Sequence, residues 1–275
     1  NNYNNVESFG NGYYATRLQV GNSFGSIYGF KYKGVYAYGF DNLEKAQAEG
    51  KTCPVARDMN GNIMYNYDGT VKPMYYYYNS TKYQFQGGDA IYEDQNGDGS
   101  IDQYDVVYLG NCNPKLSGGW GLTLRYDKFS VNFFCNFRYG NKIINKARMD
   151  AENMYYAYNQ CSTVNWRWRK EGDVTNVPRA VYQQGYNWLG SDRYVEDGSF
   201  MRMKYITFRY TFPTTWTKSL GMSRVSAYFT INNLFCLTKY SGADPEINSN
   251  TATGVVTDNS TTPRSKDWTL GLSVN

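Results

Sequence analysis

An acidic loop, residues 94–105, has the residue types and spacing of a calcium-binding loop. It places acidic or amide side chains at its first, third and fifth positions and a glycine at the sixth, where an EF-hand loop turns sharply. Ca²⁺ takes about six to eight oxygen ligands, and carboxylates gathered this closely would repel one another without a cation. The predicted metal ligands are Asp94, Asn96, Asp98, Ser100 (through its carbonyl), Asp102 and Asp105.

The expected ion in this acidic loop is Ca²⁺ in a structural role, with Mg²⁺ as the alternative. Asp105 stands where an EF-hand loop has a glutamate, and the flanking residues, Gly87-Gly88 before and 106–108 after, are not helical in character. The competing interpretation is a solvated turn rich in Asp and Asn.

No arrangement in the sequence has the chemistry of an enzyme. Histidine is absent, which excludes histidine acid–base catalysis and histidine metal ligands. The five cysteines have no Cys-x-x-Cys spacing, and their odd number argues against a complete disulfide framework. A catalytic carboxylate pair could be proposed among Asp192, Glu196 and Asp197, but their position at a solvated loop edge accounts for them better. We predict that the chain is not an enzyme and has no catalytic or cofactor-binding residues.

The charge distribution and the aromatic residues indicate which classes of ligand the chain could bind. The net charge is +4 with acids and bases interleaved, so no basic stripe for nucleic acid is present. A run of four tyrosines at 75–78 and the pair Trp166 and Trp168 could stack on sugar rings or contact peptides. Packing between loops, or contact with a partner protein, explains these aromatics equally well.

The elements that must position these side chains alternate apolar and polar residues with a period of two, which predicts β-strands. One segment places Trp120, Leu122 and Leu124 on one face, and Thr123 and Arg125 on the other. The predicted strands are 119–126, 129–139, 205–212, 224–233 and 267–275, with a weaker, glycine-rich strand at 24–38. In 129–139 the alternation has one exception, Phe134.

Strand length and loop length favour a membrane barrel over a soluble sandwich. The strands reach roughly 9–11 residues, the length that crosses a bilayer when tilted. Aromatic residues occur near the strand ends, as in interfacial girdles, and short turns at 127–128 and 213–223 alternate with long polar segments at 39–116, 140–198 and 237–265. The predicted fold is all-β, part of a large antiparallel transmembrane β-barrel with long extracellular loops.

This topology predicts which side chains face lipid and which face the lumen. The lipid-facing sets are Trp120/Leu122/Leu124, Phe129/Val131/Phe133, Ile206/Phe208/Tyr210 and Leu270/Leu272/Val274. The lumen-facing residues are Thr123, Arg125, Asn132, Arg209, Thr230 and Thr269. The turn at 127–128 should lie at the same end of the strands as 213–223.

The extent of the chain predicts a portion of a larger barrel. Six candidate strands cannot enclose a large pore, since plugged transporters have about 22 strands. The chain begins at Asn1 and shows no export signal, so a mature start or a missing front is expected. We therefore assign 1–275 to the carboxy-terminal strands and loops of a barrel.

Several motifs, in order and spacing, resemble SusC/RagA-type TonB-dependent transporters from about residue 20 to the end. They are the glycine-rich approach at 21–35, Gly-Asn-Cys-Asn-Pro-Lys at 110–115, the run 193–204 that leads to Tyr210 and Pro213, 232–235 with 238–240 and Asp244-Pro245-Glu246, and 263–265 with 270–272. The chain departs from the family at Cys112, where the family has a proline, and lacks the family's final aromatic residue, its plug and its TonB box.

The resemblance implies import of oligosaccharides or peptides through the outer membrane of a Gram-negative bacterium of the Bacteroidetes type. Implied partners are a SusD-like lipoprotein, TonB acting through the missing amino-terminal part, and outer-membrane lipid. Two alternatives stay open. One is a passive channel or adhesin barrel, which a plug and TonB box upstream would exclude. The other is a soluble calcium-dependent carbohydrate-binding β-sandwich, which would need no detergent.

Overall fold

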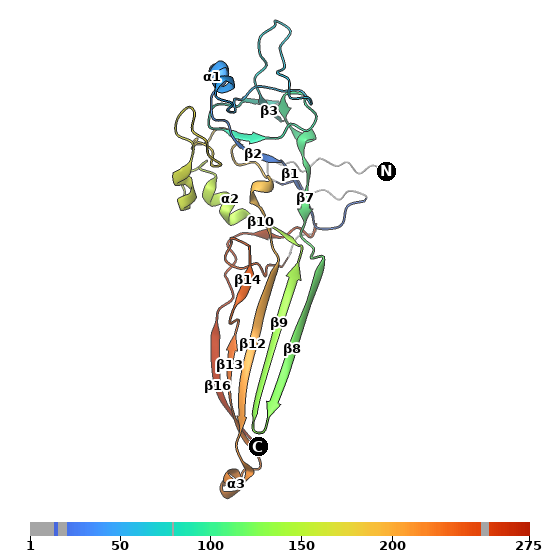
Figure 1. Ribbon diagram of the computed structural model, residues 1–275, viewed down its shortest axis with the longest axis vertical. Helices are drawn as coiled ribbons and strands as arrows, with labels where there is room; N and C mark the ends of the chain where they lie inside the picture. Colours follow the sequence, from blue (N-terminus) through green and yellow to red (C-terminus); the bar gives the residue numbers. More distant parts are fainter. Residues whose placement is uncertain (1–13, 16–20, 79, 249–252) are drawn as a thin grey trace. The chain divides into compact units, whose positions relative to one another are not determined.

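The computed structural model describes residues 14–15, 21–78, 80–248 and 253–275 (Figure 1). The chain divides into two compact units. Unit 1 takes in the described parts of Asn1–Cys112, Ile144–Glu196 and Ser249–Asn259, and unit 2 takes in Asn113–Ile143, Asp197–Asn248 and Ser260–Asn275. Within these described ranges, no helix is long and apolar enough to cross a membrane.

Strands dominate both units. The strands are β1 (Ser26–Gly29), β2 (Tyr32–Val35), β3 (Tyr75–Tyr78), β4 (Thr81–Gln84), β5 (Ala90–Tyr92), β6 (Ser100–Ile101), β7 (Val107–Asn111), β8 (Leu116–Tyr126), β9 (Phe129–Tyr139), β10 (Lys142–Asn145), β11 (Val195–Asp197), β12 (Phe200–Thr211), β13 (Val225–Asn232), β14 (Cys236–Thr238), β15 (Thr257–Asp258) and β16 (Asp267–Val274). The α-helices are α1 (Leu43–Ala48), α2 (Lys146–Glu152) and α3 (Thr214–Thr217).

Unit 2 is built on one antiparallel sheet of long strands in the order β16-β13-β12-β9-β8, with β14 paired to β12 (Figure 1). All five long strands were predicted, and β8 and β12 extend further toward their amino ends than the alternation indicated. The extension of β12 crosses a register shift between Met203 and Tyr205. A strict period of two breaks at such an irregularity, which explains why the sequence located only the second half of β12.

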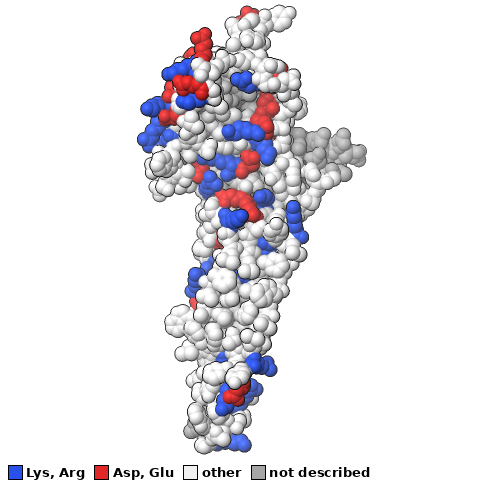
Figure 2. All heavy atoms as spheres, in the orientation of Figure 1, with Lys and Arg blue, Asp and Glu red and all other residues white. Residues whose placement is uncertain are grey.

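The sheet has one apolar and one polar face, as the alternation predicted. Leu122 pairs with Phe133, Phe133 with Ile206, and Ile206 with Ile231, so apolar side chains form continuous rows across the strands. Within unit 2 this apolar face lies open: Phe129 is 60% exposed and Leu270 72%. Figure 2 shows few charged side chains over the middle of these strands on the side in view.

Both short connections lie at one end of the sheet, as predicted. Asp127 takes a left-handed backbone conformation (φ 50°), which Asp tolerates better than most residues, and closes the two-residue turn between β8 and β9. The Thr211 N–H donates to the Lys128 carbonyl at 2.8 Å, so β12 ends beside this turn and leads into α3. The longer connections, from β9 to β12 and from β13 to β16, join the strands at the opposite end of the sheet.

Two aromatic residues on the polar face lie over glycines. Phe134, the exception in the alternation, pairs with Gly121, and a Cβ atom placed on Gly119 would come within 2.5 Å of its ring. Tyr228 pairs with Gly271, where an added Cβ would lie 2.4 Å from the ring. A glycine opposite each ring leaves the space that the ring fills. The exception at Phe134 therefore follows from cross-strand packing.

Unit 1 corrects the prediction of one strand at 24–38. That segment forms two short strands, β1 paired with β7 and β2 paired with β5, and neither belongs to the sheet of unit 2. Gly34 has a φ of 120°, a conformation open to glycine, and the β2–β5 register shifts beside it. The prediction of one strand was wrong because β1 and β2 pair with different strands, β7 and β5, and a local alternation cannot show where pairing changes.

Most of the segments predicted as long polar loops fold into unit 1 around a buried core. The core residues are Ala15, Tyr28, Phe30, Tyr36, Met74, Tyr76, Phe85, Ala90, Tyr92, Ile101, Val106 and Leu189. Two of its tyrosines have hydrogen-bonded hydroxyls: Tyr28 accepts from the Asn22 amide at 2.7 Å, and Tyr92 donates to the Tyr186 carbonyl and accepts from the Leu189 N–H. Tyrosine can therefore serve as a core residue in a chain of low mean hydropathy.

Candidate functional site

The acidic loop places its carboxylates against its own backbone. Asp94 accepts from the N–H groups of Gly97 and Gly99, each at 2.7 Å. Asp98 accepts from the Ser100 N–H at 2.8 Å and from the Asn96 amide at 2.9 Å. These contacts form a series of turns stabilised by side-chain oxygens.

The far end of the acidic loop is a capped 3-10 turn at Gln103–Asp105. Asp102 accepts from the Tyr104 N–H, and Asp105 accepts from the N–H groups of Asp102 and Gln95 at 2.7 Å each. Burial raises the pKa of Asp105 to about 7, although the backbone donors act to lower it. Asp105 is therefore a buried carboxyl that orders both ends of the loop.

The oxygen atoms of the acidic loop are of the type that calcium prefers, and the hydrogen bonds above already engage several of them. Across the described ranges, no three Asp, Glu, Cys or His side chains form a group that could hold a metal ion. The Ser100 carbonyl belongs to β6, which pairs with β3. Hydrogen bonds close the loop in this arrangement, and calcium binding stays a prediction.

The three carboxylates considered for a catalytic pair are half-buried and bonded to the surrounding structure. Asp192 accepts from the Tyr32 N–H at 2.8 Å. Glu196 lies 3.1 Å from Arg148, and Asp197 accepts from Ser199. Each carboxylate thus has a local structural partner.

All five cysteines are free. In unit 1, burial raises the pKa of the Cys53 and Cys112 thiols to about 11. Both are thus protonated near neutral pH and have little nucleophilic character.

The polar face of the unit 2 sheet lines a hollow of about 760 Å³. Hydrogen bonds run across the strands on this face, from Asn132 to Thr123 at 3.0 Å and between Thr207 and Thr230 at 2.9 Å. Arg209 donates to Ser226 at 3.0 Å. Four of the six predicted lumen-facing residues, Thr123, Arg125, Asn132 and Arg209, line the hollow, while Thr230 and Thr269 pair with each other outside its lining. The face is thus both hydrophilic and preorganised.

A buried ion cluster in unit 2 escaped the sequence analysis. Glu246 lies 2.6 Å from Lys204, 3.0 Å from Arg264 and 3.1 Å from Arg202, while Arg202 also lies 2.6 Å from Asp244. The cluster, which we call the Glu246 cluster, ties the segment after β14 to β12. The sequence shows two basic residues, Arg202 and Lys204, close together in β12. It could not show their carboxylate partners, which lie 42 positions further along the chain.

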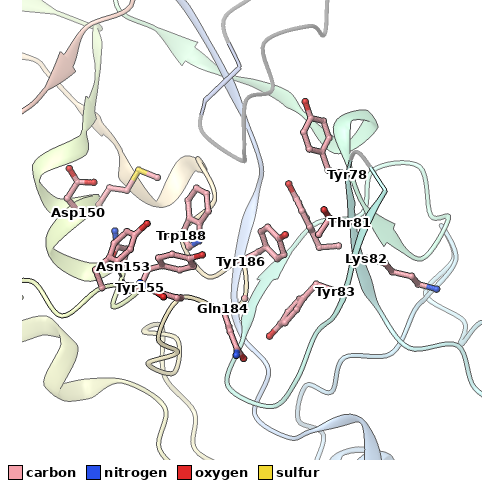
Figure 3. A pocket seen from close by; sticks show the side chains of 15 residues that line it. Tyr78, Thr81, Lys82, Tyr83, Asp150, Asn153, Tyr155, Gln184, Tyr186 and Trp188 are labelled. Atoms are coloured by element: carbon pink, nitrogen blue, oxygen red, sulfur yellow. Dashed lines mark hydrogen bonds between the residues drawn. The ribbon is translucent and has the colours of Figure 1, made fainter.

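An aromatic pocket of about 600 Å³ lies within unit 1 (Figure 3). One side comes from the β3–β4 hairpin and the other from segments 149–156 and 183–188. Six of the aromatic side chains that line it are Tyr76, Tyr78, Tyr83, Tyr155, Tyr186 and Trp188. The rings of Tyr76 and Tyr186 are stacked with centroids 3.8 Å apart, which joins the two sides.

The tyrosines of 75–78 and the two tryptophans, singled out in the sequence as possible ligand contacts, have different roles in the structure. Tyr76 is buried in the core, and the Trp168 indole donates to the Ala37 carbonyl at 3.1 Å, so packing explains both. Tyr78 lines the pocket, whereas Trp166 lies elsewhere on the surface and is 77% exposed. The residues of 149–188 that complete the pocket had no pattern that could assign them.

A buried carboxylate fixes one wall of the aromatic pocket. Asp89 lies 2.7 Å from Arg179 and accepts hydrogen bonds from the Tyr83 hydroxyl at 2.7 Å and from Asn187 at 3.2 Å. Burial raises the pKa of Tyr83 well above its ordinary value, and Asp89 adds to the effect. Tyr83 therefore stays a neutral donor whose ring is held against the pocket.

Comparison with known proteins gives a consistent result. No protein-family model matches the chain. The chain is 30% identical over 269 residues to the TonB-dependent receptor P39 of Formosa agariphila, covering 94% of this chain and 25% of the receptor. It is 25% identical over 195 residues to the TonB-dependent receptor SusC of Bacteroides thetaiotaomicron, covering 68% of this chain and 17% of SusC. The chain thus spans about a quarter, or less, of the length of these relatives.

The fold is also similar to that of solved transporter structures. A chain of the RagAB peptide importer in its "closed-closed" state superposes with a TM-score of 0.59 at 18% identity, covering 95% of this chain and 26% of that chain. The likeness confirms the predicted fold class: the long strands belong to a larger antiparallel barrel. The relatives are receptors and transporters, not enzymes, as predicted.

Proposed function

Because the chain belongs to the SusC/RagA family of TonB-dependent receptors, we propose that it forms part of an importer of the outer membrane. The substrate class is oligosaccharides or peptides, and the partners are TonB, as the source of energy, and a SusD-like surface lipoprotein. We also propose, as the sequence indicated, that residues 1–275 are the carboxy-terminal strands and loops of the barrel.

The two-faced sheet of unit 2 is the observation that carries the proposal. Leu270, Leu272 and Trp268 are each more than two-thirds exposed on the apolar face, and hydrocarbon would remove this surface from water. The opposite face lines a hydrophilic hollow with Thr123, Arg125 and Arg209. Lipid on one side and a water-filled lumen on the other would satisfy both faces at once.

The same observation argues against the soluble β-sandwich. A sandwich packs the apolar faces of two sheets together, with the strands about 10 Å apart between layers. In unit 2 the apolar face has no second sheet over it, and Trp120 and Phe129 are at least half exposed. Such an open apolar face would promote aggregation in water.

Uptake by whole cells tests the proposal. Cells that carry the intact receptor gene should accumulate labelled oligosaccharides or peptides, and deletion of that gene should abolish the uptake. Loss of TonB should abolish it to the same extent. Uptake that persists without TonB would favour the passive channel. Binding to surfaces without uptake would favour the adhesin, and recovery of the receptor from the soluble fraction without detergent would favour the sandwich.

A further inference from the structure

We propose that the aromatic pocket of unit 1 binds a neutral sugar unit of an oligosaccharide. The inference rests on the importer function proposed above and narrows its substrate class from oligosaccharides or peptides to neutral saccharides.

The aromatic pocket is held open by contacts that do not involve a ligand. The Gln183 N–H donates to the Tyr155 carbonyl at 2.9 Å, which joins the two segments of one wall. Tyr186 stacks on the buried Tyr76, and the Tyr83 hydroxyl is bound to Asp89. A ligand would therefore meet rings whose orientation is already set, and little conformational entropy would be lost on binding.

The exposed ring surface suits a pyranose. Tyr155, Tyr186 and Trp188 are half-buried, and Figure 3 shows all three gathered around the pocket. Tyr156, which also lines the pocket, is 43% exposed and packs edge-on against Tyr155 with centroids 4.8 Å apart. A sugar ring has an apolar C–H face that packs on the electron-rich face of an aromatic ring, while its hydroxyls remain at the edge.

The polar side chains of the aromatic pocket are of a kind that hydrogen-bonds well to sugar hydroxyls. Amide side chains from Asn153, Gln183 and Gln184 line it, and an amide offers both a donor and an acceptor. A sugar hydroxyl also donates and accepts, so each can bind an amide in either sense.

The aromatic pocket has one positively and one negatively charged side chain in the described part of its lining. Of the described residues that line it, Lys82 and Asp150 are the charged ones. The Lys82 ammonium lies 3.8 Å from the centre of the Tyr75 ring, which is not part of the pocket lining, and Asp150 lies 2.6 Å from Lys146. One positive and one negative side chain give the described lining no net charge, which favours a neutral ligand over a charged one.

The test uses the intact receptor purified in detergent. An array of neutral and acidic oligosaccharides and a tryptic digest of casein are screened, and the strongest ligand is measured by calorimetry. We expect a neutral oligosaccharide. Tyr156→Ala should raise its Kd about tenfold, the loss of one aromatic contact. Tyr182→Ala is the matched control, because Tyr182 is 64% exposed and lies in the neighbouring segment outside the pocket.

Fluorescence supplies a second measurement. Ligand binding should change the tryptophan emission of the unchanged receptor, and Trp188→Phe should remove most of that change if the sugar lies against this ring. This variant keeps an aromatic ring in place, so it tests location without emptying the pocket.

Three results would overturn the inference: no neutral oligosaccharide binds, the strongest ligand is a peptide or an acidic saccharide, or Tyr156→Ala and Tyr182→Ala bind alike. TonB-dependent uptake of the same ligand is measured in parallel. Peptide uptake that needs TonB would leave the importer standing and remove the sugar pocket. Sugar binding that is lost in Tyr156→Ala, without any uptake, would keep the pocket and remove the importer.

Discussion

An arginine on the apolar face of β12 should destabilise the barrel by an amount that depends on depth. The apolar positions of β12 run from Met201, which pairs with Phe137, to Tyr210, which pairs with Phe129. Nine steps of roughly 3.4 Å give about 30 Å along the strand. A tilt of about 40° reduces this to roughly 23 Å, close to the height of a barrel's apolar band. The midplane then falls near Ile206, and Phe208 lies about 6 Å from it.

These depths set the expected free-energy costs. Relative to alanine at the same position, we expect arginine to cost about 3 kcal/mol at Ile206, about 2 kcal/mol at Phe208 and less than about 1 kcal/mol at Tyr210. Thr207→Arg is the matched control, because Thr207 bonds to Thr230 on the polar face and lines the hydrophilic hollow. It should cost less than any of the deep substitutions.

The assay is reversible denaturant unfolding of the intact receptor in phospholipid bilayers, followed by tryptophan fluorescence. The free energy of unfolding is compared between each arginine variant and the alanine variant at the same site, which separates the charge from the lost ring. Equal costs at Thr207 and Phe208 would refute the assignment of the two faces. A cost that did not fall from Ile206 to Tyr210 would refute the depth assignment.

Three further predictions concern the Glu246 cluster, the acidic loop and the orientation of the chain. Glu246→Gln should cost about 3 kcal/mol of unfolding free energy, because it removes a buried carboxylate that pairs with Lys204, Arg264 and the buried Arg202. Lys146→Gln, in a more exposed pair, should cost at most about 0.5 kcal/mol, and equal losses in a denaturant titration would contradict this. Asp98→Ala should make the acidic loop more sensitive to limited proteolysis while leaving the barrel folded, and calorimetry should detect Ca²⁺ binding that this variant lacks; no heat at millimolar Ca²⁺ would remove the metal. An epitope inserted after Gly69 should bind antibody on intact cells, whereas one after Lys128 should do so only after permeabilisation; the reverse result would invert the orientation.

The long strands could be predicted because their information is local. In β8 and β9, successive side chains point to opposite faces, so the pattern of residues records which face is apolar. The two-residue turn with Asp127 then requires the strands to be antiparallel and in one register. The same locality misled at 24–38, where β1 and β2 pair with strands far along the chain.

The binding surfaces could not be predicted, because they are assembled from distant segments. Tyr83 and Tyr186 lie on opposite sides of the aromatic pocket and are 103 positions apart in the chain, yet their rings are in edge contact. Glu246 reaches Lys204 across 42 positions. Aromatic runs and charge pairs in a sequence do not say which of them will meet.

The sequence by itself determined the barrel class, the two faces of the sheet and the family, since alternation, turn residues and ordered motifs are properties of neighbouring positions. Only the tertiary structure decided that Phe134 lies over Gly121, that tyrosines such as Tyr28 form the core of unit 1, and that the acidic loop closes on its own backbone. The physical reason is packing: which side chains fill a space, and which oxygen a donor reaches, depends on contacts between segments that the local pattern does not encode.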